Sequence, residues 1–166
     1  MHITDSLLAR DEPLLGRFCD SLRHIDGQQD VGRDAFGRPR SALARQLGYK
    51  QFQYFGGMSA RFIFGCALVD LGYLNSVFVY VVDTTTGETF KRSLRRPGHW
   101  GMTLAGNPVE GISVFSGGGV EVRQAYHADP REKSLLVRVG DQLRIEAVMP
   151  VVVAMPRSTT MRRSAT

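Results

Sequence analysis

The most regular hydrophobic pattern in the chain lies between residues 49 and 83, where large apolar side chains alternate with smaller or polar ones. A two-residue period puts alternate side chains on one face of a β-strand, so this stretch predicts three consecutive strands joined by short turns. Gly56 and Gly57 are expected to end the first of them. Aromatic residues recur at this spacing: Phe52, Tyr54, Phe62, Phe64, Phe78 and Tyr80.

Further alternating runs follow, separated by turns that contain glycine, proline or aspartate. Gly140 and Asp141 between two such runs are typical of a two-residue hairpin loop. The whole pattern predicts eight strands, at about 49–55, 61–71, 76–83, 88–94, 111–116, 120–127, 133–139 and 142–149. It indicates an all-β fold, an antiparallel eight-stranded meander. Closure into a barrel would leave no strand edge exposed and is the expected architecture, with a two-sheet β-sandwich as the alternative.

The segments that flank the β-rich region lack its alternation of apolar and polar residues. Residues 1–48 are mostly irregular and are expected to pack on the barrel as a loop that contains one short helix, Ser41–Gly48, with serine at its N-cap. Residues 49–155 form the antiparallel β domain. Residues 156–166 have no hydrophobic period and are rich in serine, threonine and arginine, so they are expected to form a disordered basic tail.

Charge and composition narrow the class of protein. The net charge is +5, but Arg157, Arg162 and Arg163 in the tail contribute three of these charges, so a solvated surface is favoured over a nucleic-acid interface. No apolar run approaches the length of a membrane span, and the first residues lack the pattern of a signal peptide. The expectation is a cytoplasmic protein with reduced cysteines, in which Cys66 is a small buried hydrophobe.

Two pairs of residues are candidates for chemistry. His99 and Trp100 lie in the long irregular stretch 95–107, where Trp100 is expected either to cap a barrel mouth over a ligand or to plug the end of the core. Asp70 and Asp83 lie near strand ends, where an aspartate either caps a turn or, if buried, acts as a general acid. Asp70 and His99 are the catalytic candidates.

The aromatic positions suggest a ligand site or simple core packing. As a site, Phe62, Phe64, Phe78, Tyr80 and Trp100 would line a pocket for a small apolar molecule. The four histidines are scattered without ligand spacing, so neither a metal nor a cofactor is expected. No phosphate-binding glycine motif and no nucleophile elbow occurs, which leaves nucleotide binding and serine hydrolysis unsupported.

Several segments resemble a bacterial family known as the domain of unknown function 2804 family. They are GRFCD, YKQFQYFGG, FGCALVDLGY and VFVYVVD, and the resemblance covers roughly Leu15 to Pro150. It implies a relationship to lipocalin-like double-barrel proteins, the group that includes carotenoid hydratases. Family members usually continue into a second β-rich half, so this chain is expected to correspond to the N-terminal half.

Three functions are compatible with these observations. The first is a lipocalin-like β module that binds a small apolar ligand, a lipid or an isoprenoid. The second is a hydratase or isomerase on the same fold that uses Asp70 or His99. The third is a structural half-domain of a truncated two-barrel protein, which would self-associate or pair with a second β domain through an exposed strand.

Overall fold

The computed structural model describes residues 33, 35–107 and 110–151, together with the backbone of four two-residue strands. These short strands form two antiparallel pairs. β1 (Leu8–Ala9) pairs with β2 (Glu12–Pro13), and β3 (Arg17–Phe18) pairs with β13 (Thr159–Thr160). The rest of the expected tail, and most of the expected N-terminal segment, lie outside the described residues.

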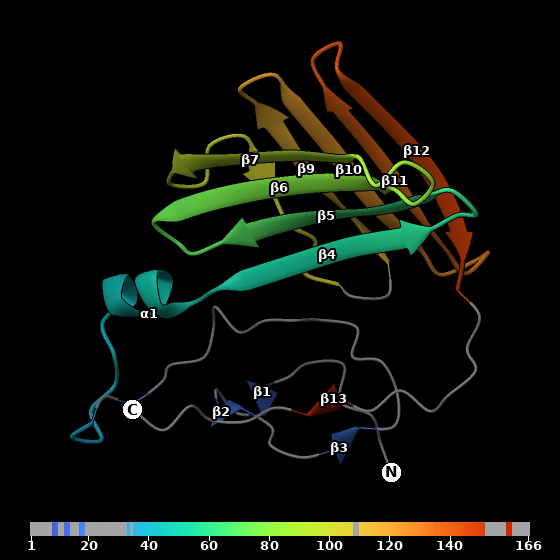
Figure 1. The fold of residues 1–166 in the computed structure, drawn as a ribbon. Coiled ribbons are helices and arrows are strands. Elements are labelled where there is room, and N and C mark those ends of the chain that lie inside the picture. Colours follow the sequence, from blue (N-terminus) through green and yellow to red (C-terminus); the bar gives the residue numbers. More distant parts are fainter. Residues whose placement is uncertain are drawn as a thin grey trace.

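The described strands of the β domain form two antiparallel sheets. The first sheet has four strands in sequence order: β4 (Gln51–Met58), β5 (Phe62–Asp70), β6 (Leu74–Asp83) and β7 (Thr89–Pro97). The second has five, also in sequence order: β8 (Met102–Thr103), β9 (Gly111–Gly117), β10 (Val120–His127), β11 (Glu132–Val139) and β12 (Leu143–Pro150). Figure 1 shows the strands of one sheet crossing those of the other obliquely.

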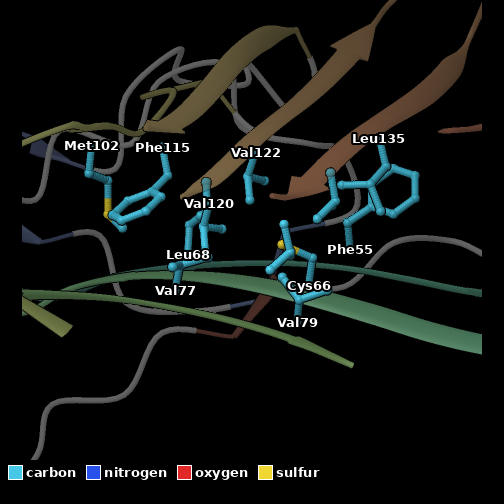
Figure 2. Packing of buried hydrophobic residues seen from close by; sticks show 12 residues of the cluster. Phe55, Cys66, Leu68, Val77, Val79, Met102, Phe115, Val120, Val122 and Leu135 are labelled. Atoms are coloured by element: carbon cyan, nitrogen blue, oxygen red, sulfur yellow. The ribbon is translucent and has the colours of Figure 1, made fainter. Parts of the chain in front are cut away.

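The two sheets pack face to face around one hydrophobic core. The first sheet contributes Phe55, Cys66, Leu68, Val77 and Val79, and the second contributes Met102, Phe115, Val120, Val122, Leu135, Val137 and Val139. Figure 2 shows these two sets of side chains meeting between the ribbons. The alternation read from the sequence arises here, because every second residue of a strand points into this layer.

The all-β, antiparallel prediction is confirmed, and the eight predicted strands correspond to β4–β7 and β9–β12. A closed barrel is not found among the described residues: the hydrogen-bonded ladders stop at β4 and β7 in one sheet and at β8 and β12 in the other. The arrangement is the two-sheet alternative. The short strand β8 lies inside the stretch that was expected to be irregular.

The prediction that Gly56 and Gly57 end the first strand is wrong. β4 continues through both to Met58, and Gly56 pairs with Gly65 of β5. The ring of Tyr54 lies over Gly56, since a Cβ placed there would come 2.8 Å from its Cε1 atom. Glycine here makes room for an aromatic ring on the sheet and does not mark a turn.

The short helix is confirmed as α1 (Ala42–Gly48). Ser41 is its N-cap, with a side-chain oxygen that accepts a hydrogen bond from the Ala44 N–H at 3.2 Å. None of its residues is buried. The helix instead meets the sheet at its C-terminal end, where a Cβ on Gly72 would lie 2.5 Å from the Gln46 carbonyl oxygen.

Leu68 offers a direct test of the core between the sheets. Its side chain is fully buried, whereas Leu43 on the helix is 65% exposed. We expect Leu68→Ala to lower the free energy of unfolding by about 3 kcal/mol, since it leaves a cavity between the sheets. Leu43→Ala should change it by less than about 0.5 kcal/mol. Urea unfolding followed by circular dichroism measures both, and equal effects would contradict the assigned core.

Cys66 tests the same core chemically. Burial raises the pKa of its thiol to about 12. Only the thiolate is nucleophilic, so in a Cys19→Ser background we expect alkylation by iodoacetamide at pH 8 to be at least about 100-fold slower in the folded than in the urea-unfolded protein. Mass spectrometry measures both rates. Because the folded pKa is raised, this group contributes stability below pH 8.5 or so that is lost progressively at higher pH.

Candidate functional site

The two catalytic candidates lie in direct contact. Nδ1 of His99 is 2.8 Å from Oδ2 of Asp70, although the two residues are 29 positions apart in the chain. The Asp70 side chain is 16% exposed and that of His99 is 46% exposed. The carboxylate is therefore largely shielded, while the imidazole remains accessible from solvent.

Asp70 is held by the end of its own strand. It is the last residue of β5, and its Oδ1 accepts a hydrogen bond of 2.8 Å from the Gly72 N–H. This is the turn-capping role expected of an aspartate at a strand end. It uses only one carboxylate oxygen, which leaves Oδ2 for His99.

His99 lies in the turn after β7, and the backbone on both sides of it is tied to the first sheet. The Gly98 N–H donates to the Tyr73 carbonyl at 2.8 Å, and Nδ2 of Asn75 donates to the Trp100 carbonyl at 3.0 Å. Asn75 is fully buried. The turn between β5 and β6 therefore positions both members of the Asp70–His99 pair.

Helix α1 completes a pocket around this pair. The pocket has a volume of about 320 Å³ and is lined by Ala42, Arg45, Gln46, Tyr49, Asp70, Gly72 and His99. This volume is near the lower limit of small-molecule sites, so it suits a small ligand. Apart from Ala42 and Gly72, every lining side chain can donate or accept a hydrogen bond.

The Asp70–His99 contact determines which nitrogen of the neutral imidazole carries the proton. A carboxylate only accepts hydrogen bonds, so Nδ1 carries a proton and donates it to Asp70. In the neutral ring Nε2 is then an acceptor, and within the part of the chain that the structure describes it has no hydrogen-bond partner. A carboxylate that orients an imidazole in this way also stabilises the imidazolium formed when Nε2 takes a proton.

The other predicted ligand residues are divided between the two faces of the first sheet. Register places Phe62 and Phe64 on the inner face with the core, and Phe78 and Tyr80 on the outer face. Trp100 is 76% exposed, so it does not plug the end of the core. These five residues do not line a common pocket.

The outer face of the first sheet carries four aromatic rings. Phe52 stacks on Tyr54 with centroids 6.4 Å apart, and Phe78 stacks on Tyr80 with centroids 6.1 Å apart. The hydroxyl oxygens of the two tyrosines are 2.8 Å apart and form a hydrogen bond. This bond is the main reason that the pKa of Tyr54 is raised to about 12, with burial second. The Tyr54 phenol is therefore neutral at ordinary pH.

Asp83 has a structural role at the opposite end of the sheet. It accepts hydrogen bonds from Nε of Arg61 at 2.8 Å and from the N–H groups of Thr85 and Thr86 at 2.9 and 3.3 Å. The hydrogen bond from Arg61 is the largest cause of its lowered pKa. It caps the β6–β7 turn, which was the alternative to a general acid.

A second hollow, of about 710 Å³, lies between the β9–β10 and β11–β12 turns. Its charged side chains are of both signs, Glu121 and Asp141 together with Arg138 and Arg144. This mixture is typical of a solvated surface. It contains no histidine or cysteine, so the smaller pocket at His99 is the better candidate for chemistry.

Sequence reasoning missed the contribution of Arg45, Gln46 and Tyr49 to the pocket. They lie on or just after α1, about 25 residues before Asp70 in the chain. Their only signal was that the helix ends shortly before the first strand. In the described ranges no group of three or more histidine, cysteine, aspartate or glutamate residues could hold a metal ion, and no helix is long and apolar enough to cross a bilayer.

Comparison with known proteins identifies the family and gives no activity. No curated protein matches the chain, and no solved structure does. A family model matches residues 34–161, which include all of the long strands. The resemblance seen in the aromatic segments is thereby confirmed. The chain belongs to the family described as a domain of unknown function (DUF2804).

Proposed function

We propose that the chain is an enzyme that transfers protons on a small polar substrate, in the manner of an isomerase or a hydratase. The observation that carries this proposal is the 2.8 Å contact between His99 and Asp70 at a pocket. An imidazole oriented by a carboxylate is a common general base. The pairing supports the enzyme hypothesis over a module without ionisable groups.

The proposed reaction assigns one role to each residue. Nε2 of His99 removes a proton from a substrate carbon, and Asp70 stabilises the resulting imidazolium. In an isomerisation, the imidazolium returns this proton to a different carbon of the same substrate. In a hydration, Nε2 instead takes a proton from water as the hydroxyl oxygen adds to the substrate, and the proton is then given to the neighbouring carbon.

Arg45 defines the expected substrate class. Its guanidinium is the one permanent cation among the residues that line the pocket, and it offers paired donors to a carboxylate or enolate oxygen. Charge that develops on a substrate oxygen during proton removal would be stabilised there. Small carboxylates and carbonyl compounds with an acidic C–H are therefore the proposed substrates.

Proton removal can be tested without knowing the product. The protein is incubated in D₂O with a panel of small unsaturated acids, hydroxy acids and ketones, and deuterium uptake at carbon is followed by NMR. We expect catalysed exchange for at least one compound, and a loss of about 100-fold or more in His99→Gln. His127→Gln, at an exposed strand end, is the matched control. No exchange with any compound, or an unchanged rate in His99→Gln, would reject the proposal.

A second variant separates orientation from folding. Asp70→Asn keeps an oxygen that can accept the Gly72 N–H, but removes the charge that stabilises the imidazolium. We expect the exchange rate to fall about tenfold or more, while thermal unfolding shifts by only a few degrees. The two quantities are measured on the same sample. A large loss of stability with proportionate loss of exchange would mean that Asp70 acts only through the turn.

A second candidate function is the binding of a small apolar molecule, a lipid or an isoprenoid. It is supported by the exposure of Phe52 and Phe78 on the outer face of the first sheet, at 65% and 37%. This function does not require a lipocalin-like barrel, since the rings lie on an open face. Pairing with a second β domain is the competing use of the same surface.

A further inference from the structure

The outer face of the first sheet is apolar where an outward sheet face is ordinarily polar. Its positions alternate with the core positions in β4–β7, and several large side chains on it remain exposed: Phe52 (65%), Tyr54 (42%), Met58 (77%), Ile63 (36%) and Phe78 (37%). We call this surface the aromatic face. It belongs to neither the core nor the His99 pocket.

Two small residues of β5, one of the two inner strands of the first sheet, leave room for the rings of the aromatic face. Ala67 of β5 lies between Tyr54 of β4 and Phe78 of β6, and Gly65 lies between Gly56 and Tyr80. A Cβ on Gly65 would come 2.7 Å from Cζ of Tyr80, so this ring lies across the glycine. Ala67 is fully buried although it points outward. The rings therefore cover the middle of β5, around Gly65 and Ala67.

The charge on this face has a single sign. The four strands contain two acidic residues, Asp70 and Asp83, and both occupy positions on the inner side of the register. On the outer side Lys91 pairs with Tyr80, and Arg95 pairs with Ser76, both from the edge strand β7. Both cations are exposed, and within the described ranges neither has a hydrogen-bond or ion-pair partner.

We infer that the aromatic face binds a single-chain anionic amphiphile, with its carboxylate or phosphate head at Lys91 and Arg95 and its apolar chain across the rings of Tyr80, Phe78 and Tyr54. The inference rests on the second candidate function and adds the charge of the ligand to it. Apolar contact with the rings supplies most of the affinity, and the two cations select the head group. A second copy of this face is disfavoured, because like charges would meet across the interface.

Three amphiphiles with a ten-carbon chain separate these contributions. Decanoate, 1-decanoylglycerol and decyltrimethylammonium are titrated below their micelle concentrations into ¹⁵N-labelled protein, and amide shifts are followed. Decanoate should bind at least about fivefold more tightly than the neutral ester and should move resonances of β4, β6 and β7. The cationic amphiphile should bind most weakly, and added salt should reduce the advantage of decanoate.

Matched variants assign the effect to residues. Lys91→Gln with Arg95→Gln should remove the preference for decanoate and leave the affinity for the neutral ester unchanged. Arg123→Gln with Arg138→Gln removes the same charge from exposed positions in the other sheet and should leave all three affinities unchanged. Phe78→Ser should weaken the binding of all three ligands about tenfold or more. Thermal unfolding checks that each variant is folded.

The outcomes are distinct. Equal binding of decanoate and the neutral ester would overturn the anionic head group while leaving apolar binding intact. No binding of any amphiphile would overturn both the inference and the second candidate function. Shifts confined to the α1 pocket would assign the decanoate to Arg45 and overturn the inference. A fluorescent ten-nucleotide oligothymidine is tested in the same way. If it binds, if Lys91→Gln with Arg95→Gln abolishes its binding, and if decanoate does not bind, the ligand would be single-stranded nucleic acid and not an amphiphile.

Discussion

The packing of β5 and β6 against the second sheet is the constraint on which the other features depend. Because the side-chain period of a strand is two, a shift of register by one residue would move Leu68, Val77 and Val79 from the core to the surface. The core thus fixes the register. With the register fixed, Asp70 comes at the end of β5 and the aromatic rings come on the opposite face from the core.

The position of the Asp70–His99 pair depends on the end of the first sheet. Neither residue belongs to the core, and the helix that closes their pocket buries none of its own residues. The pair is held by backbone hydrogen bonds from the turn between β5 and β6 and by the buried Asn75. The pair is therefore anchored at the end of the sheet, and the walls of its pocket come from three separate segments.

Much of the fold could be predicted from the sequence, because alternation and turn residues are local signals. The strand Val120–His127 was predicted with the bounds that the structure has, and the helix with its serine cap was also correct. Gly56 and Gly57 misled, since glycine is common both in turns and beneath aromatic rings. Two sheets and a closed barrel differ only in which strand edges are hydrogen-bonded, and single-strand patterns do not carry that information.

The candidate site was predictable only in part. Asp70 and His99 were each recognisable by residue type and position, but their contact depends on how the turn after β7 folds back on the sheet. Phe62 and Phe64 lie on one face of the sheet, and Phe78 and Tyr80 lie on the other. Which face a residue occupies depends on the residue that it pairs with on the neighbouring strand, and this register is not visible in the sequence. The role of Arg45 depends on where α1 meets Gly72, a tertiary contact that the sequence does not reveal.

The paired glycines Gly56 and Gly65 have a consequence for how the aromatic face can change during evolution. The shape of the aromatic face is determined as much by these two residues without side chains as by the tyrosines that lie over them. A substitution at either glycine therefore affects the tyrosine that lies over it. Among relatives, we expect replacement of either glycine to be accompanied by loss of the ring above it, so that the surface is kept or lost as a whole.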